Sequence, residues 1–138
     1  MKLGRMLSDV LASLVRAPAT RRYPSQRQLA PLRLRGPVEW DRSRCTGCGV
    51  CVMDCPANAL QLFTFDKARK RFVLEYHIDR CAFCGQCSES CAQNALWMSH
   101  TRWELADASR EPLTVLFGLD EDVARVMAEG AADEPVKR

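Results

Sequence analysis

The sequence lacks the long apolar runs and leader segments that mark membrane-spanning or exported chains. No window approaches the ~18 uncharged apolar residues that a membrane-spanning helix requires. Near the N-terminus, Ser8, Asp9 and Ser13 interrupt the apolar stretch, so it does not fit the core of a secretory signal. We therefore expect a cytoplasmic chain with reduced thiols that does not cross a bilayer by itself.

Signatures of catalysis are missing as well. The sequence has no nucleophile paired with a base, no glycine-rich phosphate loop and no paired-carboxylate motif. Its 2 histidines, His77 and His100, are not expected to be metal ligands, because the cysteines described below suffice. We expect any catalysis to belong to partner proteins. Without a recognised nucleic-acid-binding fold, nucleic acid is the least favoured partner.

What the sequence does contain is an uneven distribution of cysteine. The length of 138 residues predicts one domain, and 27% charged with 47% hydrophobic residues is typical of a globular protein rather than a disordered one. All 8 cysteines lie between Cys45 and Cys91. Such clustering needs a local explanation, which can be disulfides, zinc or iron-sulfur clusters.

The cysteine spacing favours iron-sulfur clusters. Two motifs have the form C-x2-C-x2-C-x3-C of bacterial ferredoxins, namely Cys45, Cys48, Cys51 and Cys55, then Cys81, Cys84, Cys87 and Cys91. Zinc sites usually take two C-x2-C pairs separated by a dozen or more residues, and disulfides need export. Three closely spaced thiolates can each reach a different iron of one cubane. The sequence therefore predicts two 4Fe-4S clusters, with zinc and disulfides as the less favoured alternatives.

The repeat extends beyond the cysteines and indicates a duplicated unit. At an offset of 36 residues without a gap, Val38-Glu39-Trp40 aligns with Leu74-Glu75-Tyr76, and Asn58-Ala59-Leu60 with Asn94-Ala95-Leu96. In two-cluster ferredoxins the last cysteine of each motif ligates the cluster of the other motif. We therefore expect two ligand sets: Cys45, Cys48, Cys51 and Cys91 for cluster 1, and Cys81, Cys84, Cys87 and Cys55 for cluster 2.

The coarse secondary structure follows the same repeat. Residues 72–78 show the period-two alternation of a half-buried strand, Gln61–Phe65 is the expected partner strand, and residues 66–70 are the polar connection. Each unit then consists of a strand, a cysteine loop, a short helix and a second strand. This order predicts an α+β fold with a duplicated ferredoxin-like core over residues 38–103, in which the clusters stabilise a small apolar core.

The N-terminal region differs from the rest in charge. Residues 1–44 hold ten Lys/Arg and three Asp/Glu, a net charge of +7, whereas residues 45–138 carry −4. Apolar residues recur at three- and four-residue intervals over 1–17, which predicts an amphipathic helix. We expect this helix to dock on a neighbouring subunit or at the membrane surface, with packing against its own core as the alternative. Four prolines predict an extended arm over 18–37.

Residues 104–138 are expected to form a C-terminal extension. Asp120 can begin a helix that runs to about Glu129 and stops at Gly130. The apolar residues within 113–117 are expected to pack against a neighbouring element, and residues 131–138 to form a frayed tail.

The two segments Cys45–Cys51 and Cys81–Cys87, with the sequences CTGCGVC and CAFCGQC, resemble the 8Fe ferredoxin superfamily. Together with the N-terminal helix, the Arg21-Arg22-Tyr23-Pro24 stretch and Trp103-Glu104-Leu105-Ala106, they make residues 1–117 similar to one family of iron-sulfur subunits. That family is the two-cluster subunit shared by respiratory complex I and the energy-converting membrane-bound nickel-iron hydrogenases, including formate hydrogenlyase. The second cysteine segment followed by Trp103–Ala106 favours the hydrogenase side.

The resemblance implies an electron-transfer subunit that is not catalytic on its own. It would relay single electrons through two 4Fe-4S clusters from a peripheral electron-input module to a catalytic subunit, on the cytoplasmic face of the membrane. The implied partners are catalytic and iron-sulfur subunits of a multi-subunit complex. A free soluble 8Fe ferredoxin and a subunit of an NADH-quinone oxidoreductase stay open as alternatives. The basic arm and the length outside the cysteine core favour a subunit over a free carrier.

One position departs from the motif. Ala92 follows Cys91, whereas Pro56 follows Cys55 in the first unit. Because proline has no backbone N–H, alanine adds one donor beside cluster 1. Either this N–H points at a sulfur and raises the reduction potential of cluster 1, or it bonds elsewhere.

Overall fold

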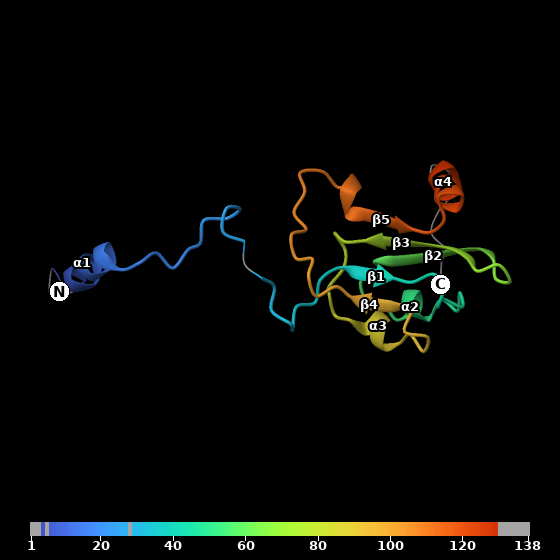
Figure 1. Cartoon of the computed structure of the whole chain (residues 1–138), viewed down its shortest axis with the longest axis horizontal. Coiled ribbons are helices and arrows are strands. Elements are labelled where there is room, and N and C mark those ends of the chain that lie inside the picture. Colours follow the sequence, from blue (N-terminus) through green and yellow to red (C-terminus); the bar gives the residue numbers. More distant parts are fainter. Residues whose placement is uncertain (1–3, 5, 28, 130–138) are drawn as a thin grey trace.

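The computed structural model describes residues 4, 6–27 and 29–129 (Figure 1). Two small sheets and three helices form the body of the molecule, and an N-terminal segment with one further helix extends away from it. The expected helix stop at Gly130 and the frayed tail over residues 131–138 lie outside the described residues.

The body is built on two antiparallel sheets. β1 (Val38–Trp40) pairs with β4 (Leu96–Met98), and β2 (Leu60–Asp66) pairs with β3 (Arg71–His77). β5 (Thr114–Phe117) pairs with the other edge of β3, which gives the order β2-β3-β5. The period-two prediction of β3 and of its partner strand β2 is therefore confirmed.

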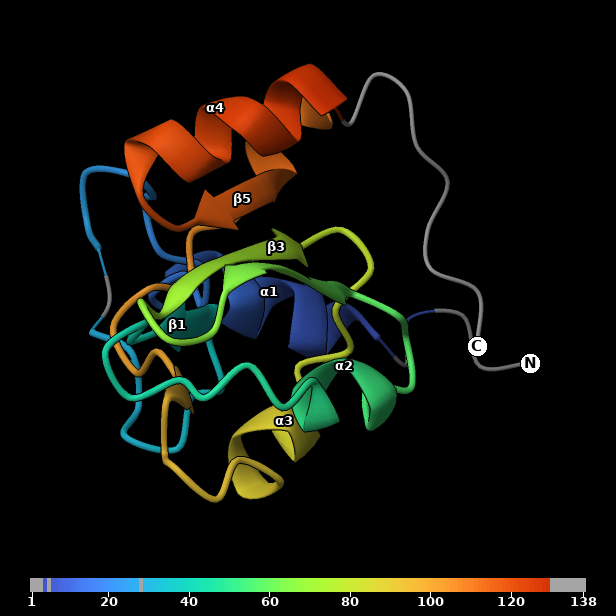
Figure 2. The same ribbon diagram turned by 90° about the vertical axis from the view of Figure 1, so that its right-hand side faces the viewer.

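A short helix follows each cysteine loop. α2 (Val50–Met53) begins after Gly49, and α3 (Gln86–Glu89) begins after Gly85. The two helices pack against each other on the side of the sheets opposite α4 (Asp120–Glu129) (Figure 2). The order of strand, cysteine loop, helix and strand occurs twice along the chain.

The apolar core lies where the two sheets and the two short helices meet. Its buried members are Val38, Leu60, Leu74, Tyr76, Ile78, Cys87, Leu96 and Met98. Several of these positions are equivalent at the 36-residue offset, such as Leu60 and Leu96. A core this small buries little apolar surface, so further links are needed to hold the body together.

The C-terminal extension covers the outer face of β3. A 3-10 turn (Glu111–Leu113) leads into β5. The apolar residues at 113–117 pack against the core, as predicted, and four residues of this segment form a strand that the sequence did not predict. α4 follows, and its Asp122 is fully buried in a two-pronged ion pair with Arg71. The hydrogen bonds from the Arg71 guanidinium hold the pKa of Asp122 below its usual range. This pair fixes α4 to the sheet.

The N-terminal arm lies along the segment that follows β4. The rings of Tyr23 and Trp103 are 5.9 Å apart, and Arg27 Nη1 lies 3.5 Å from Glu104 Oε2. Closer to the body, the Gly36 N–H donates to the Ser99 carbonyl at 2.8 Å, which extends the pairing of β1 with β4. The arm thus has contacts within its own chain.

The helix at the start of the arm lies away from the body (Figure 1). α1 (Leu7–Val15) contains no buried residue, and it ends before Pro18. In the described part of the chain, no helix is long and apolar enough to cross a membrane.

Candidate iron-sulfur site

The cysteines line two cavities. The first cavity, of about 260 Å³, is lined by Cys45, Cys48, Cys51 and Cys91. The second, of about 20 Å³, is lined by Cys55, Cys81, Cys84 and Cys87. Each cavity thus combines three cysteines of one motif with the last cysteine of the other, and the structure brings together the same residues that the repeat grouped. Among the described residues, no three potential ligands converge closely enough for a single metal ion, and the thiols line the cavity walls instead.

The same backbone geometry surrounds both cavities. In the first motif, the Gly47 N–H donates to Cys45 Sγ at 3.4 Å, and the Ala59 N–H donates to Cys55 Sγ at 3.2 Å. In the second motif, the corresponding donors are Phe83, at 3.4 Å from Cys81 Sγ, and Ala95, at 3.3 Å from Cys91 Sγ. Sulfur accepts such bonds best as a thiolate, so the loops are arranged for negatively charged sulfur.

These bonds bear on the hypothesis about Ala92 drawn from the sequence. Among the described residues the donor to Cys91 Sγ is Ala95, and no cysteine sulfur accepts a hydrogen bond from Ala92. The first repeat has the equivalent bond from Ala59 to Cys55, although Pro56 stands there. The Ala95 bond to Cys91 therefore does not depend on the exchange of proline for alanine. Ala92 itself lines the first cavity, and the effect of its N–H on cluster 1 stays a prediction.

Burial makes the bare thiols resist ionisation. Burial, helped by the neighbouring Cys45 and Cys48 thiols, raises the pKa of Cys51 to about 12. In the second cavity, burial and then Cys81 and Cys55 raise the pKa of Cys87 to about 11. Four thiolates can share such a cavity only with cations that compensate their charge, and the irons of a cluster supply that charge. The donor sets and the N–H···S bonds therefore match the ligand chemistry of a 4Fe-4S cluster at both sites, although the second cavity is the narrower one in this structure.

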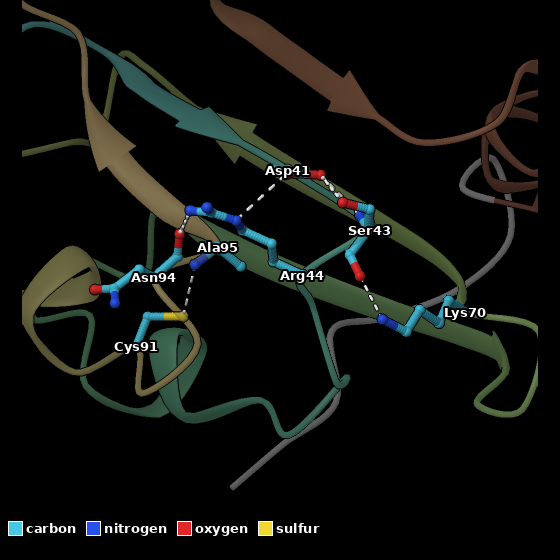
Figure 3. Close-up of polar contacts among 7 residues, drawn as sticks. All are labelled: Asp41, Ser43, Arg44, Lys70, Cys91, Asn94 and Ala95. Carbon is cyan, nitrogen blue, oxygen red and sulfur yellow. Dashed lines mark hydrogen bonds and ion pairs between the residues drawn. The ribbon is translucent and has the colours of Figure 1, made fainter.

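Cationic side chains tie the cysteine loops to the rest of the body. Arg44 precedes the first motif, yet its Nη1 donates to the Asn94 carbonyl at 3.3 Å and its Nε lies 3.7 Å from Asp41 (Figure 3). Because Asn94 belongs to the turn after Cys91, this contact holds the last cysteine of the second motif against the first cavity. Lys70 similarly donates to the Ser43 carbonyl.

The second cavity also has a cation bonded to its cysteine loop, and sequence reasoning missed this contact. Arg35, from the end of the N-terminal arm, donates through Nη1 to the Cys84 carbonyl at 2.9 Å. The two residues are 49 positions apart, and no local pattern links them. The positive charge beside the second loop favours negative charge in the cavity.

The histidines contribute to neither cavity. His77 faces Thr114 Oγ1 at 3.2 Å and Glu75 Oε1 at 3.3 Å, and His100 Nδ1 lies 3.0 Å from the Leu34 carbonyl. Neither residue lines the four-thiol cavities.

Residues 44–95 match the family model described as the 4Fe-4S dicluster domain. This part of the chain is similar to that family. With eight free cysteines in two cavities, this match confirms the prediction of two 4Fe-4S clusters.

Relatives in larger proteins share part of this segment. The chain is 37% identical over 70 residues to NAD(P)H-quinone oxidoreductase subunit I of Nostoc sp., covering 50% of this chain and 36% of the relative. It is 39% identical over 61 residues to NADH-quinone oxidoreductase subunit I 2 of Anaeromyxobacter dehalogenans, covering 41% and 23%. The chain is related to these subunits, and the match spans about a third or less of their length.

The fold has a counterpart among solved structures. It superposes with a TM-score of 0.63 and 23% identity on a chain of the membrane-bound sulfane sulfur reductase, an archaeal respiratory membrane complex. The superposition covers 91% of this chain and 69% of the other. At this level of identity the likeness establishes the fold.

Proposed function

We propose that this chain is an electron-transfer subunit that passes single electrons between two 4Fe-4S clusters with exchanged ligands. Cys45, Cys48, Cys51 and Cys91 hold cluster 1, and Cys81, Cys84, Cys87 and Cys55 hold cluster 2. The observation that carries the proposal is the composition of the two cavities, each with four thiols drawn from both motifs. We propose that the two cysteine motifs and their flanking segments descend from one duplicated unit.

The two cavities are close neighbours, as a relay requires. Leu74 lines the first cavity and Tyr76 lines the second, and both lie on β3. Two residues along a strand span about 7 Å, so the walls of the two cavities share one strand. Cys48 and Cys84 are exposed, which leaves an edge of each cavity open to solvent or to a partner protein. One cluster can then accept an electron from a partner while the other delivers it.

The N-terminal helix supports a role inside a complex. α1 has nine residues and buries none of them, and isolated helices this short are marginal in water. Its large exposed apolar side chains are Leu7, Val10, Leu11, Leu14 and Val15. We infer that α1 docks on a neighbouring subunit or at the membrane surface, and that the basic arm follows it to the body. The subunit would then be peripheral, on the cytoplasmic face.

The type of complex is a finer proposal. The Cys81–Cys87 segment and Trp103–Ala106 favour a membrane-bound hydrogenase, with a peripheral electron-input module and a catalytic subunit as neighbours. The relatives named as NAD(P)H-quinone oxidoreductase subunits favour the second candidate, a complex I-like enzyme. Both candidates use the chain in the same way, as a relay without catalysis of its own.

Anaerobic purification of the native complex tests the proposal. We expect about eight irons and eight acid-labile sulfides per chain, and copurifying catalytic and iron-sulfur subunits that mass spectrometry can identify. Nickel and hydrogen turnover in the complex would favour the hydrogenase, whereas NADH or quinone turnover would favour the complex I-like enzyme. Stoichiometric zinc without iron would overturn the cluster assignment. A monomer recovered without partners would overturn the subunit role and leave a free ferredoxin.

A further inference from the structure

One buried polar atom in the wall of the second cavity has no hydrogen-bond partner. The Tyr76 side chain is completely buried on β3, and its hydroxyl oxygen is the buried side-chain atom without a partner among the described residues. Buried hydroxyl groups nearly always have a partner, because burying an unpaired donor is costly. A hydroxyl in this position indicates an acceptor that comes within reach only when the cavity is filled.

The surroundings of the hydroxyl point to sulfur as that acceptor. Its cavity neighbours Val38, Leu60 and Met98 offer no oxygen or nitrogen side-chain atom. Cys81 lines the same cavity and influences the hydroxyl directly. Burial raises the pKa of Tyr76 above its ordinary value, and the Cys81 side chain raises it further. A tyrosine hydroxyl that is buried in the same cavity wall as Cys81 can donate a hydrogen bond to its sulfur.

We propose that the Tyr76 hydroxyl donates a hydrogen bond to the Cys81 sulfur of cluster 2 and thereby raises the reduction potential of that cluster. The inference rests on the proposed function, since it needs cluster 2 in the second cavity. On reduction the cluster gains one electron from its redox partner, no bond is broken, and the proton stays on Tyr76. The added negative charge strengthens the hydrogen bond, so the donor stabilises the reduced cluster more than the oxidised one.

The repeat makes the effect specific to one cluster. At the 36-residue offset the position of Tyr76 is taken by Trp40, which lines the first cavity and has no hydroxyl. Cluster 1 therefore serves as an internal reference in every measurement. Tyr23, the other of the 2 tyrosines in the chain, offers a matched control, because it lies in the exposed arm outside both cavities.

The test is a redox titration of the full chain, followed by electron paramagnetic resonance. For Tyr76→Phe we expect cluster 2 to be roughly tenfold harder to reduce, a decrease of about 59 mV for a one-electron couple, with cluster 1 unchanged. This is comparable to the contribution of one hydrogen bond to a charged acceptor. Tyr23→Phe should change neither potential.

A second variant covers the case in which Tyr76→Phe does not assemble cluster 2. In a Tyr23→Phe background, global labelling with 3-fluorotyrosine alters only residue 76 and makes its hydroxyl a stronger donor. We expect the potential of cluster 2 to rise, with cluster 1 again unchanged. If both clusters are loaded and neither change shifts cluster 2, the hydrogen-bond inference is wrong while the proposed function stands. If the unaltered chain contains no iron-sulfur cluster, the proposed function itself fails.

Discussion

Replacement of Gly47 by alanine should destabilise the first cysteine loop for two separable reasons. Gly47 has a φ of 69°, a left-handed conformation that costs other residues on the order of 1–2 kcal/mol. A Cβ at this position would lie 2.4 Å from Cε1 of Phe72, whose side chain is fully buried and therefore cannot move aside easily. Overpacking of this kind costs about 1–3 kcal/mol. Together the two terms lower the free energy of unfolding by roughly 2–5 kcal/mol.

Gly49 supplies the matched control. It has a φ of 77°, but a Cβ there would meet no atom within 4 Å. Gly49→Ala therefore carries only the backbone cost, about 1–2 kcal/mol. The second repeat supports the separation, because Phe83, the equivalent of Gly47, has a φ of 51° and carries a full side chain. The second loop therefore accepts a side chain in the left-handed conformation at the equivalent position. We expect the contact with Phe72 to supply the larger part of the loss of stability in Gly47→Ala.

Both variants are purified anaerobically with their clusters loaded. Each is then heated at the same scan rate, and the loss of cluster absorption gives the thermal midpoint. A loss of 2–5 kcal/mol corresponds to a fall in the thermal midpoint on the order of 10 °C for a chain of this size. We expect this fall for Gly47→Ala and less than half of it for Gly49→Ala. Equal midpoints for the two variants would show that the contact with Phe72 contributes nothing.

Three further outcomes follow from the described contacts. Cys55→Ser should perturb the paramagnetic signal of cluster 2 and spare cluster 1, while Cys91→Ser should do the reverse; local ligation would give the opposite pattern in both. Since Arg71 lowers the pKa of Asp122, the carboxylate stays ionised and its stabilising effect is lost only as pH falls through the lowered pKa. The stability difference between the unaltered chain and Asp122→Asn should therefore be constant between about pH 5 and pH 8, and a difference that shrinks towards pH 5 would contradict this. Deletion of residues 1–17 should leave both clusters loaded but release the chain from its complex, and full copurification of the shortened chain would show that α1 is dispensable.

Local patterns were sufficient for the elements that repeat. The cysteine spacing and the 36-residue offset indicated a duplicated unit with two clusters. The ligand exchange of two-cluster ferredoxins then grouped Cys91 with the first motif and Cys55 with the second, and the cavities contain the same groups. The period-two alternation over 72–78 predicted β3 because Phe72, Leu74 and Tyr76 are fully buried, whereas Glu75 and His77 are only half-buried. Val73, on the alternate face, is fully buried as well.

Contacts between distant residues left no such pattern. The apolar run at 113–117 gave no sign that Phe117 would pair with Leu74 in the sheet, since pairing depends on a partner strand far away in sequence. Asp122 looked like an ordinary acidic residue in the first turn of a helix, yet it is fully buried against Arg71. The missing partner of the Tyr76 hydroxyl could be recognised only once its neighbours were in place.

The parts outside the repeat make its two halves unequal. β5 pairs only with β3, and the Phe117 ring lies 6.5 Å from Trp40 in an edge-on contact, so the C-terminal extension packs over a wall of the first cavity. Each cavity has one cation beside it, Arg44 at the first and Arg35 at the second, so the feature particular to the second cavity is the unpaired hydroxyl of Tyr76. A hydrogen-bond donor favours the more negative, reduced state of a cluster, whereas apolar cover disfavours it. In the proposed relay, cluster 2 would therefore have the higher potential, and electrons that enter through cluster 1 would move downhill to cluster 2.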